Sequence, residues 1–159
     1  MNYWLFKTEP STYSWDDLKQ QPDRTDYWDG IRNYQARNFL RDQVKKGDLV
    51  LFYHSVKQPQ AIMGIARVVR EAYPDPTAFD PDSRYYDPKS DPDNPRWFMV
   101  DVQAIAEFEP PILRDELKRV PGLENMMLLR KGSRLSIQPV TEEEWQSILA
   151  FRNPVDLDV

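Results

Sequence analysis

One segment of strict alternation, residues 96–107, constrains the fold of this chain more than any other part of the sequence. Every second position in the segment holds an apolar residue: Phe98, Val100, Val102, Ala104 and Ala106. A period of two residues is that of a β-strand with one buried face, because successive side chains of a strand point to opposite sides. The segment therefore predicts a long strand that packs on a core.

Shorter elements surround this strand in a mixed order. Apolar segments at residues 3–7, 48–54, 61–70 and 134–140 predict four further strands. Gly64 lies inside one of these strands, where a glycine marks a bulge or the close approach of another group.

Short helices are expected between the strands. Ser14, Asn33 and Thr141 are N-cap candidates, and the last of these opens a capping box with Glu144. The expected helices begin at residue 14, cover residues 34–45, 113–120 and 123–129, and begin again after residue 141. Five or six short strands interleaved with short helices predict an α+β fold, a small and strongly bent mixed sheet or barrel with helices around it. The regular βαβ spacing of a doubly wound fold is absent.

The chain length predicts a single domain over residues 1–159. Residues 73–96 differ from the rest of the chain, because they hold six prolines and many aspartates. Four aromatic residues give this segment side chains to pack, so a long, ordered arm is expected. Loops of this length in compact domains are usually functional or mobile.

Several classes of chemistry are excluded by what the sequence lacks. It has no cysteine, which excludes disulfides, zinc–cysteine sites and iron–sulfur clusters, and its single histidine, His54, excludes a multi-histidine metal site. Glycine motifs that bind phosphates or dinucleotides are absent, so no cofactor is expected. No apolar run approaches the roughly 20 residues that span a bilayer, and the N-terminus lacks a secretory pattern. A cytoplasmic location is therefore the default expectation.

The sequence offers no strong catalytic constellation. Ser55 directly follows His54, and adjacent strand residues point to opposite faces, so the two do not easily form a nucleophile–base pair. Asp16 and Asp17 are more simply the first turn of a helix, where carboxylates favour the helix dipole. We therefore expect a protein that is not an enzyme.

One region of the chain instead combines aromatic, basic and amide side chains. Aromatic rings stack on nucleobases, asparagine and serine read base edges, and arginine holds phosphates. Any single aromatic residue is more simply part of the core, and this interpretation is favoured for Trp4, Trp97 and Trp145 because each lies in a regular element. Trp28 differs because it lies in a polar, glycine-containing loop. The residues of the region are Trp28, Arg32, Asn33, Arg37, Tyr53, His54 and Ser55.

Three cations recur at every fourth position of the helix expected over residues 34–45. Arg37, Arg41 and Lys45 would lie on one helix face and could contact phosphates, although the chain as a whole carries a formal charge of −5. The alternative interpretation is an ordinary solvated helix face.

These motifs together resemble the EVE domain family over about residues 2–150. The resemblance is carried by Tyr3–Ser11, Trp28–Asn38, Phe52–Ser55, Tyr86–Ser90 and Arg134–Ser136, among other segments. It implies a PUA-like fold, related to the YTH and ASCH domains. It also implies a non-catalytic reader that binds a modified nucleobase flipped out of its strand. The base would be 5-methylcytosine or 5-hydroxymethylcytosine in DNA, or a modified base in RNA.

Carried onto this chain, the resemblance assigns a role to each candidate residue. Trp28 would be the stacking platform of the base pocket, with Arg32 and Asn33 making polar contacts. The rim would consist of Lys7, Thr8 and Ser11. The facing strand end would consist of Tyr53, His54 and Ser55. The flanking phosphates would lie on Arg37, Arg41 and Lys45.

Two other functions stay open at this point. The chain could be a small-molecule or protein-interaction module that uses residues 73–96 as its contact surface. It could also be a nucleotide-processing hydrolase that uses His54 and an acid, which is the weaker alternative because the remaining catalytic groups are missing.

Overall fold

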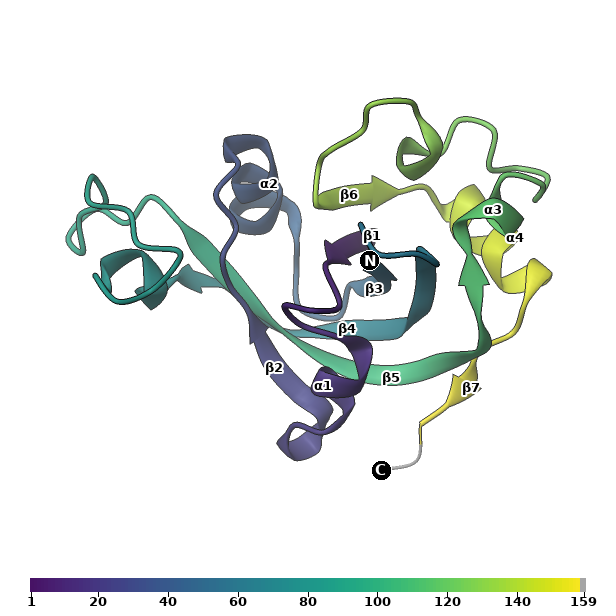
Figure 1. The fold of residues 1–159 in the computed structure, drawn as a ribbon, viewed down its shortest axis with the longest axis horizontal. Coiled ribbons are helices and arrows are strands. Elements are labelled where there is room, and N and C mark those ends of the chain that lie inside the picture. The colour runs from purple at the N-terminus through teal and green to yellow at the C-terminus, as the bar shows by residue number, and fades with distance from the viewer. Residues whose placement is uncertain (158–159) are drawn as a thin grey trace.

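A computed structural model of the chain describes residues 1–157, and its main element is a mixed sheet of seven strands within those residues (Figure 1). The strand order is β2-β5-β4-β3-β1-β6, and β7 pairs with β5. The strands are β1 (Tyr3–Thr8), β2 (Thr25–Trp28), β3 (Leu49–His54), β4 (Ala61–Pro74), β5 (Phe98–Leu113), β6 (Ile137–Val140) and β7 (Val155–Asp156).

The sheet is mixed because β1 runs parallel to β3, whereas the other pairs are antiparallel. It bends strongly without closing into a barrel, since β2 and β6 end the strand order. The register between the long strands β4 and β5 shifts at four places, the first between Ile62 and Gly64. Such irregularities bend and twist strands. The strongly bent mixed sheet is thus confirmed. The structure has seven strands where five or six were expected, and the short strands β2 and β7 lie outside the five ranges expected from the sequence.

Short helices lie around the sheet. They are α1 (Trp15–Lys19), α2 (Tyr34–Asn38), α3 (Arg114–Leu117) and α4 (Glu142–Phe151), with single turns η1 (Pro22–Arg24), η2 (Phe39–Gln43), η3 (Pro76–Phe79) and η4 (Met127–Leu129). In Figure 1, α2 stands beside β6, and α3 and α4 lie together at the opposite side of the molecule. Of the described helices, none is long and apolar enough to cross a membrane.

The three expected N-caps are confirmed. The side chains of Ser14, Asn33 and Thr141 each accept a hydrogen bond from a backbone N–H three residues later, at 3.0–3.1 Å. These bonds satisfy donors that the first helical turn leaves free. The local sequence therefore determines where α1, α2 and α4 begin.

Three expected helices are wrong in extent. The helix expected over residues 34–45 is regular only to Asn38 and continues as the π-helical turn η2 to Gln43, with Val44 N–H bonded to the carbonyl of Phe39 at 2.9 Å. The wider turn interrupts the four-residue repeat, and Lys45 lies beyond it, so the three cations do not form one regular helical stripe. The helix expected over 113–120 is shortened to α3, and the helix expected over 123–129 is reduced to η4.

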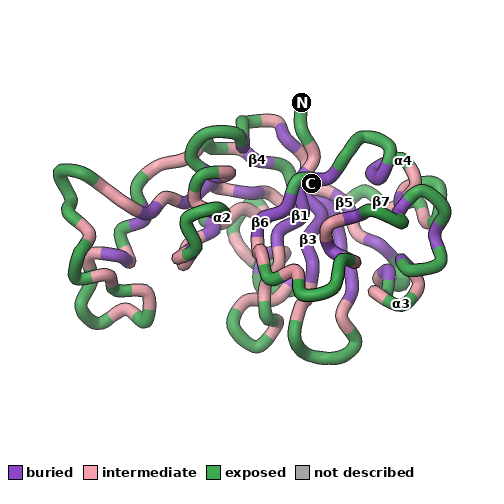
Figure 2. The backbone as a smooth tube through the Cα atoms, turned by 90° about the horizontal axis from the view of Figure 1, so that it is seen from above, coloured by how far each residue is buried: buried purple, intermediate pink, exposed green. Residues whose placement is uncertain are grey.

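The core lies on both faces of the sheet. Trp4 and Phe6 belong to one buried cluster and Leu5 to the other, as expected for alternating residues of β1. Figure 2 shows the buried residues gathered in the central strands, with exposed and intermediate residues in the outer loops. The expectation that Trp4, Trp97 and Trp145 are core residues is confirmed, because they are 2%, 5% and 3% exposed.

Gly64 confirms the close approach that a glycine in a strand predicts. A Cβ at this position would lie 2.2 Å from the ring of Trp15. The missing side chain therefore allows α1 to pack directly on β4.

Candidate functional site

A pocket of about 540 Å³ lies where the end of β1 meets the end of β2. We call it the Trp28 pocket, and its volume falls in the range of about 300–1,000 Å³ that ligand sites occupy. It is lined by Lys7, Thr8, Glu9, Thr12, Tyr13, Asp26, Tyr27, Trp28, Asp29, Gly30, Ile31, Arg84, Tyr85 and Ser136. The wall thus combines aromatic rings, carboxylates and two cations from four separate parts of the chain.

Trp28 connects the pocket to the core. It is the last residue of β2 and is 7% exposed. Its ring packs against Phe6 and Phe52, with centroids 5.3 and 5.4 Å away. These contacts hold the indole rigidly, so the part that reaches the pocket offers a fixed aromatic surface.

Hydrogen bonds order the neighbouring pocket wall. The hydroxyl of Tyr13 donates to Asp26 at 2.6 Å, and the other oxygen of Asp26 accepts from the backbone N–H of Tyr27 at 2.8 Å. The hydroxyl of Thr8 donates to the carbonyl of Tyr13 at 3.0 Å. Asp26 is therefore engaged within the protein, whereas the ring of Tyr27 is 53% exposed at the mouth of the pocket.

Asp29 is the carboxylate of the pocket with the most unusual environment. It is partly buried, and burial, with the nearby charge of Asp75, raises its pKa above the usual range, although Arg32 opposes the effect. Among the residues that the structure describes, its side chain accepts no hydrogen bond from another residue, in contrast to Asp26. A carboxylate in this position is ready to accept hydrogen bonds from a ligand.

Lys7 contributes a positive charge to the pocket wall. Its ammonium donates to the carbonyl of Ser133 at 3.3 Å. Burial and the positive charge of Arg114 lower the pKa of Lys7. An anionic group bound next to Lys7 would offset both effects.

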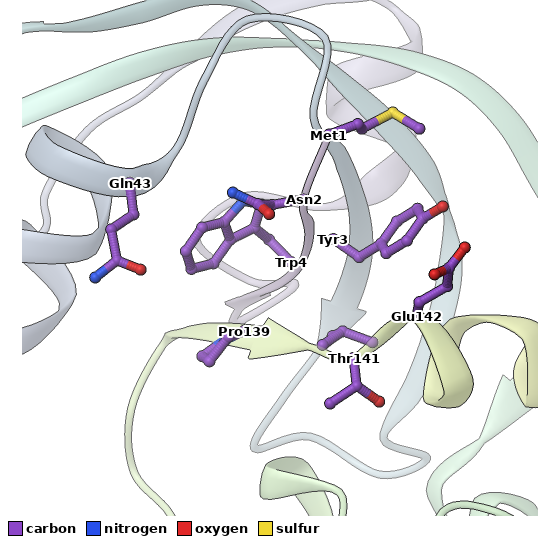
Figure 3. A pocket seen from close by; sticks show the side chains of 9 residues that line it. Met1, Asn2, Tyr3, Trp4, Gln43, Pro139, Thr141 and Glu142 are labelled. Atoms are coloured by element: carbon purple, nitrogen blue, oxygen red, sulfur yellow. The ribbon is translucent and has the colours of Figure 1, made fainter.

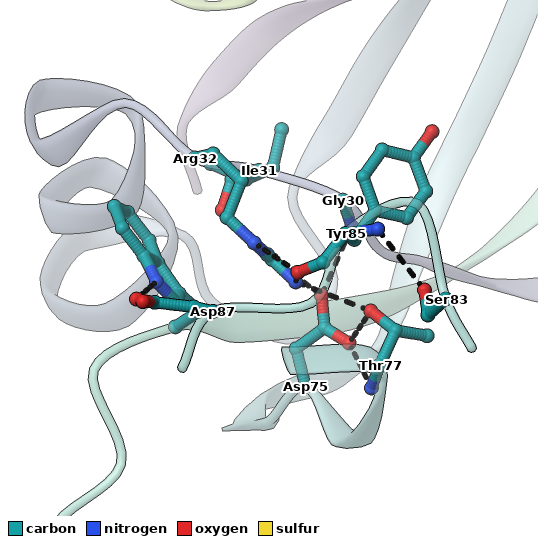
Figure 4. A network of polar contacts seen from close by, with 9 residues as sticks. Gly30, Ile31, Arg32, Asp75, Thr77, Ser83, Tyr85 and Asp87 are labelled. Carbon is teal, nitrogen blue, oxygen red and sulfur yellow. Dashed lines mark hydrogen bonds and ion pairs between the residues drawn. The ribbon is translucent and has the colours of Figure 1, made fainter. Parts of the chain in front are cut away.

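A network of polar contacts joins the arm to residues 30–32 beside the pocket (Figure 4). The guanidinium of Arg32 donates to the carbonyl of Tyr85 at 2.7 and 3.0 Å and forms an ion pair with Asp75 at 3.1 Å. Asp75 also accepts from the backbone N–H of Gly30 at 2.9 Å. These bonds join residues 30–32 to the arm.

Gly30 lets the ring of Tyr85 lie directly against the backbone. A Cβ at Gly30 would meet that ring at 2.6 Å, and the residue has a φ of +77°, which favours glycine. Tyr85 is thereby seated as a wall of the pocket, with Arg84 next to it.

The structure brings together only three of the nine residues expected to form the base pocket, namely Lys7, Thr8 and Trp28. Arg32 lies behind the wall, where it holds Tyr85. Asn33 caps α2 and faces a separate hollow. Ser11 is exposed, 3.5 Å from Glu9, and does not line the pocket.

The residues at the end of β3, which were expected to face the base pocket, instead make contacts within the fold. Tyr53 is fully buried, and its hydroxyl donates to Gln60 at 2.8 Å. The Nε2 atom of His54 accepts from the backbone N–H of Trp15 at 3.0 Å, and burial lowers the pKa of the imidazole, which favours its neutral form. The backbone N–H of Ser55 donates to the carbonyl of Thr8 at 2.9 Å. None of these side chains lines the Trp28 pocket.

The three cations expected to hold phosphates lie away from the pocket wall. Arg37 donates to the carbonyl of Arg96 at 2.8 Å, and Arg41 donates to both oxygens of Asp42 at 2.8 and 2.9 Å. The backbone N–H of Lys45 donates to Asp48 at 2.9 Å, near the start of β1.

Sequence reasoning missed several residues of the pocket. Asp26, Tyr27 and Asp29 lie within two residues of Trp28, so the aromatic and acidic composition of this segment was a signal that could have identified them. Arg84 and Tyr85 are contributed by the arm, more than 50 positions later in the chain, and no local pattern connects them to Trp28.

A second pocket of about 360 Å³ lies at the other end of β1, between Trp4, Gln43 and Thr141 (Figure 3). None of the expected site residues lines it. Within residues 1–157, no cluster of three histidine, aspartate or glutamate side chains is placed to hold a metal ion.

Comparisons with known proteins show which family this chain is similar to. The model of a family described as EVE domain matches residues 2–151. The chain is 44% identical to human thymocyte nuclear protein 1 over 167 residues, which covers 94% of this chain and 73% of the human protein.

Solved structures show the same fold. A protein from Pseudomonas syringae is 46% identical, with a TM-score of 0.88 over 94% of this chain and 98% of that one. The human THYN1 protein, whose crystal structure is a complex with DNA containing 5-methylcytosine, is 43% identical, with a TM-score of 0.90 over 95% and 97% of the two chains. The PUA-like α+β fold expected from the sequence is thus confirmed.

Proposed function

Because this chain belongs to the EVE domain family, we propose that it binds DNA that contains 5-methylcytosine and reads the modified base in the Trp28 pocket. The observation that carries the proposal is the 43% identity, over 95% of this chain, to a human protein whose crystal structure contains such DNA. The proposal includes a base flipped out of its strand, because a pocket at a protein surface cannot reach a base that stays stacked in a duplex.

Trp28 is the proposed stacking platform. Base–aromatic stacking contributes about 1–3 kcal/mol per base, and unstacking a base costs a few kcal/mol. A ring held by Phe6 and Phe52 supplies this contact without an ordering cost of its own. Tyr27 and Tyr85 add aromatic surface at the mouth of the pocket.

Asp29 is the proposed reader of the cytosine edge. The exocyclic amino group of cytosine is a hydrogen-bond donor, and aspartate or glutamate is its usual acceptor in proteins. Asp29 follows Trp28 directly, is partly buried and has no competing hydrogen bond from another described residue. Lys7 and Thr8 supply polar contacts at the rim.

The proposed activity is binding without catalysis. The lone histidine accepts the backbone N–H of Trp15 within the fold and does not line the pocket. The vertebrate relatives are named as nuclear proteins, which does not support the cytoplasmic location expected from the sequence.

A binding titration tests the proposal. Matched oligonucleotides would carry cytosine, 5-methylcytosine or 5-hydroxymethylcytosine in DNA, and adenine or methyladenine in RNA, with binding followed by fluorescence anisotropy. We expect tighter binding to DNA with 5-methylcytosine than to the unmodified strand. Equal binding to every oligonucleotide would contradict the reading role and favour a small-molecule or protein ligand.

Two tyrosines of equal exposure provide a variant and its control. Tyr27 lines the pocket and is 53% exposed, whereas Tyr34 lies outside it and is 52% exposed. We expect Tyr27→Ala to weaken binding of the methylated oligonucleotide and Tyr34→Ala to leave it nearly unchanged. Trp28→Phe, which keeps most of the core packing, should also weaken binding, and thermal unfolding verifies that each variant is folded.

A further inference from the structure

A surface loop next to the Trp28 pocket carries three cations in five residues. Its sequence is Arg130-Lys131-Gly132-Ser133-Arg134, and all three cations are exposed. No acidic residue occurs between Glu124 and Glu142. This segment, which we call the 130–134 loop, is a local positive surface on a chain of formal charge −5.

The cations of this loop are available to a ligand. Within residues 1–157, neither Arg130, Lys131 nor Arg134 forms an ion pair. Arg130 donates one hydrogen bond to the carbonyl of Asn125 at 3.1 Å. By contrast, Arg41 of η2 is paired with Asp42 through two hydrogen bonds.

Buried groups fix the loop to the pocket. Gln138, 1% exposed, donates to the carbonyl of Leu135 at 2.9 Å and to the hydroxyl of Ser133 at 3.1 Å. The backbone N–H of Lys7 donates to the carbonyl of Ser136 at 2.8 Å, and Ser136 itself lines the Trp28 pocket. The loop is therefore continuous with the pocket rim.

The loop also lines a second hollow. This hollow has a volume of about 440 Å³ and is lined by the loop together with Asn33 and Met127, whereas Ser136, two residues beyond the loop, lines the Trp28 pocket. Arg134, two residues from Ser136, is therefore the cation of the loop nearest in sequence to the pocket wall.

We propose that the 130–134 loop binds the DNA phosphates that flank the base held in the Trp28 pocket. This proposal rests on the proposed function, and it names the backbone contact surface of the same site. It replaces the contact surface expected on Arg37, Arg41 and Lys45. Lys45 lies near the start of β1, a strand of six residues whose far end reaches the pocket about 17 Å away.

Paired substitutions of equal charge test the assignment. Lys131→Gln with Arg134→Gln removes two charges from the loop, and Arg41→Gln with Lys45→Gln removes two from the alternative surface. Each phosphate that a protein neutralises on duplex DNA contributes about 0.9 to the slope of log K against log salt, or about eightfold in affinity near 0.1 M salt. We expect the loop variant to weaken binding about 10- to 60-fold and to reduce the slope by about one to two.

The pattern across oligonucleotides separates a phosphate contact from base reading. The loop variant should weaken binding to methylated and unmethylated duplexes by the same factor, because phosphate contacts carry no base information. The loop assignment is overturned if only the Arg41 and Lys45 variant weakens binding, or if the loop variant changes the preference for 5-methylcytosine.

The same titrations distinguish failure of this proposal from failure of the proposed function. Binding that depends on the loop but shows no preference for 5-methylcytosine supports the phosphate surface and contradicts the reading role. If the loop variant keeps both the affinity of the parent and its preference for 5-methylcytosine, the reading role is supported and the proposed phosphate surface is wrong. If the parent protein, without substitutions, binds no DNA even at low salt, both proposals are wrong. Equal melting temperatures of the two double variants and the parent verify that the fold is intact.

Discussion

Replacing Asp75 with Asn removes the one negative charge that joins the arm to residues 30–32. Asp75 is 0% exposed, and its two oxygens accept four hydrogen bonds, from Gly30 N–H, from Arg32 and from the N–H and hydroxyl of Thr77. An asparagine keeps one side-chain oxygen as an acceptor. Its amide group replaces the other oxygen and faces two groups that are themselves hydrogen-bond donors. The substitution therefore leaves the partly buried guanidinium of Arg32 without its counter-charge.

The expected cost follows from this geometry. Removing one partner of a buried ion pair costs about 3–5 kcal/mol. Arg32 keeps its bonds to the carbonyl of Tyr85, and 22% of its side chain is exposed, so we expect the lower part of this range, about 3 kcal/mol. For a chain of this size, such a loss lowers the melting temperature by about 6–12 °C.

Urea unfolding followed by tryptophan fluorescence measures the effect. Asp82→Asn is the control, because it changes an exposed aspartate of the same arm and should alter stability by less than about 0.5 kcal/mol. A double-mutant cycle with Arg32→Gln should give a coupling energy of about 0.5–3 kcal/mol between the two positions. A loss below about 1 kcal/mol for Asp75→Asn, or strict additivity in the cycle, would refute the assignment of the arm contact to this ion pair.

Three further predictions concern single positions. Gly30→Ala should destabilise the fold by more than Gly132→Ala. Both glycines have a φ of +77°, so both substitutions share a strain of about 1–2 kcal/mol, but only the Cβ at position 30 meets the ring of Tyr85. Equal losses of stability in urea would contradict the Tyr85 contact. Burial raises the pKa of Asp29, so the folded state binds its proton more tightly than the unfolded state and stability falls as pH rises above the unfolded pKa of about 3.9. Asp29→Asn should therefore melt at a higher temperature than the parent at neutral pH, with the difference narrowing in acid. Burial lowers the pKa of His54, so the stability that this group contributes is present above about pH 6.5 and is lost as pH falls toward the folded pKa. Between about pH 7.5 and 5.5, the melting temperature of His54→Gln should fall by less than that of the parent. The glutamine keeps an acceptor for Trp15 N–H.

Some features of the candidate site could be predicted from the sequence. The segment around Trp28 combines aromatic and acidic residues with a glycine, and this composition predicted a candidate site there. The end of β1 was also identified through Lys7 and Thr8. Tyr53 and His54 were placed in the pocket by their position at a strand end, but the structure turns both toward internal partners, Gln60 and Trp15 N–H. A strand end indicates where side chains leave the sheet and does not indicate which ones meet.

The expected cationic stripe shows a different limit. A four-residue repeat assigns Arg37, Arg41 and Lys45 to one face only if the helix stays regular. The π-helical turn from Phe39 to Gln43 breaks this condition. The turn is accompanied by the burial of Leu40 and Val44 in the core, a tertiary contact that a helical repeat does not include.

The sequence by itself determined the features that depend on neighbouring residues. Alternation marked β5, and side chains within three residues of one another capped α1, α2 and α4. These signals are local because a strand repeats every two residues and a cap bonds a donor three positions away. Tertiary structure alone decided the pocket, since Tyr85 reaches it from a position 57 residues after Trp28 and is held there by Arg32, Gly30 and the buried charge of Asp75. Contacts between such distant residues form only when the sheet has bent and the arm has packed, because the free energy that holds them comes from burial and paired charges of the whole fold.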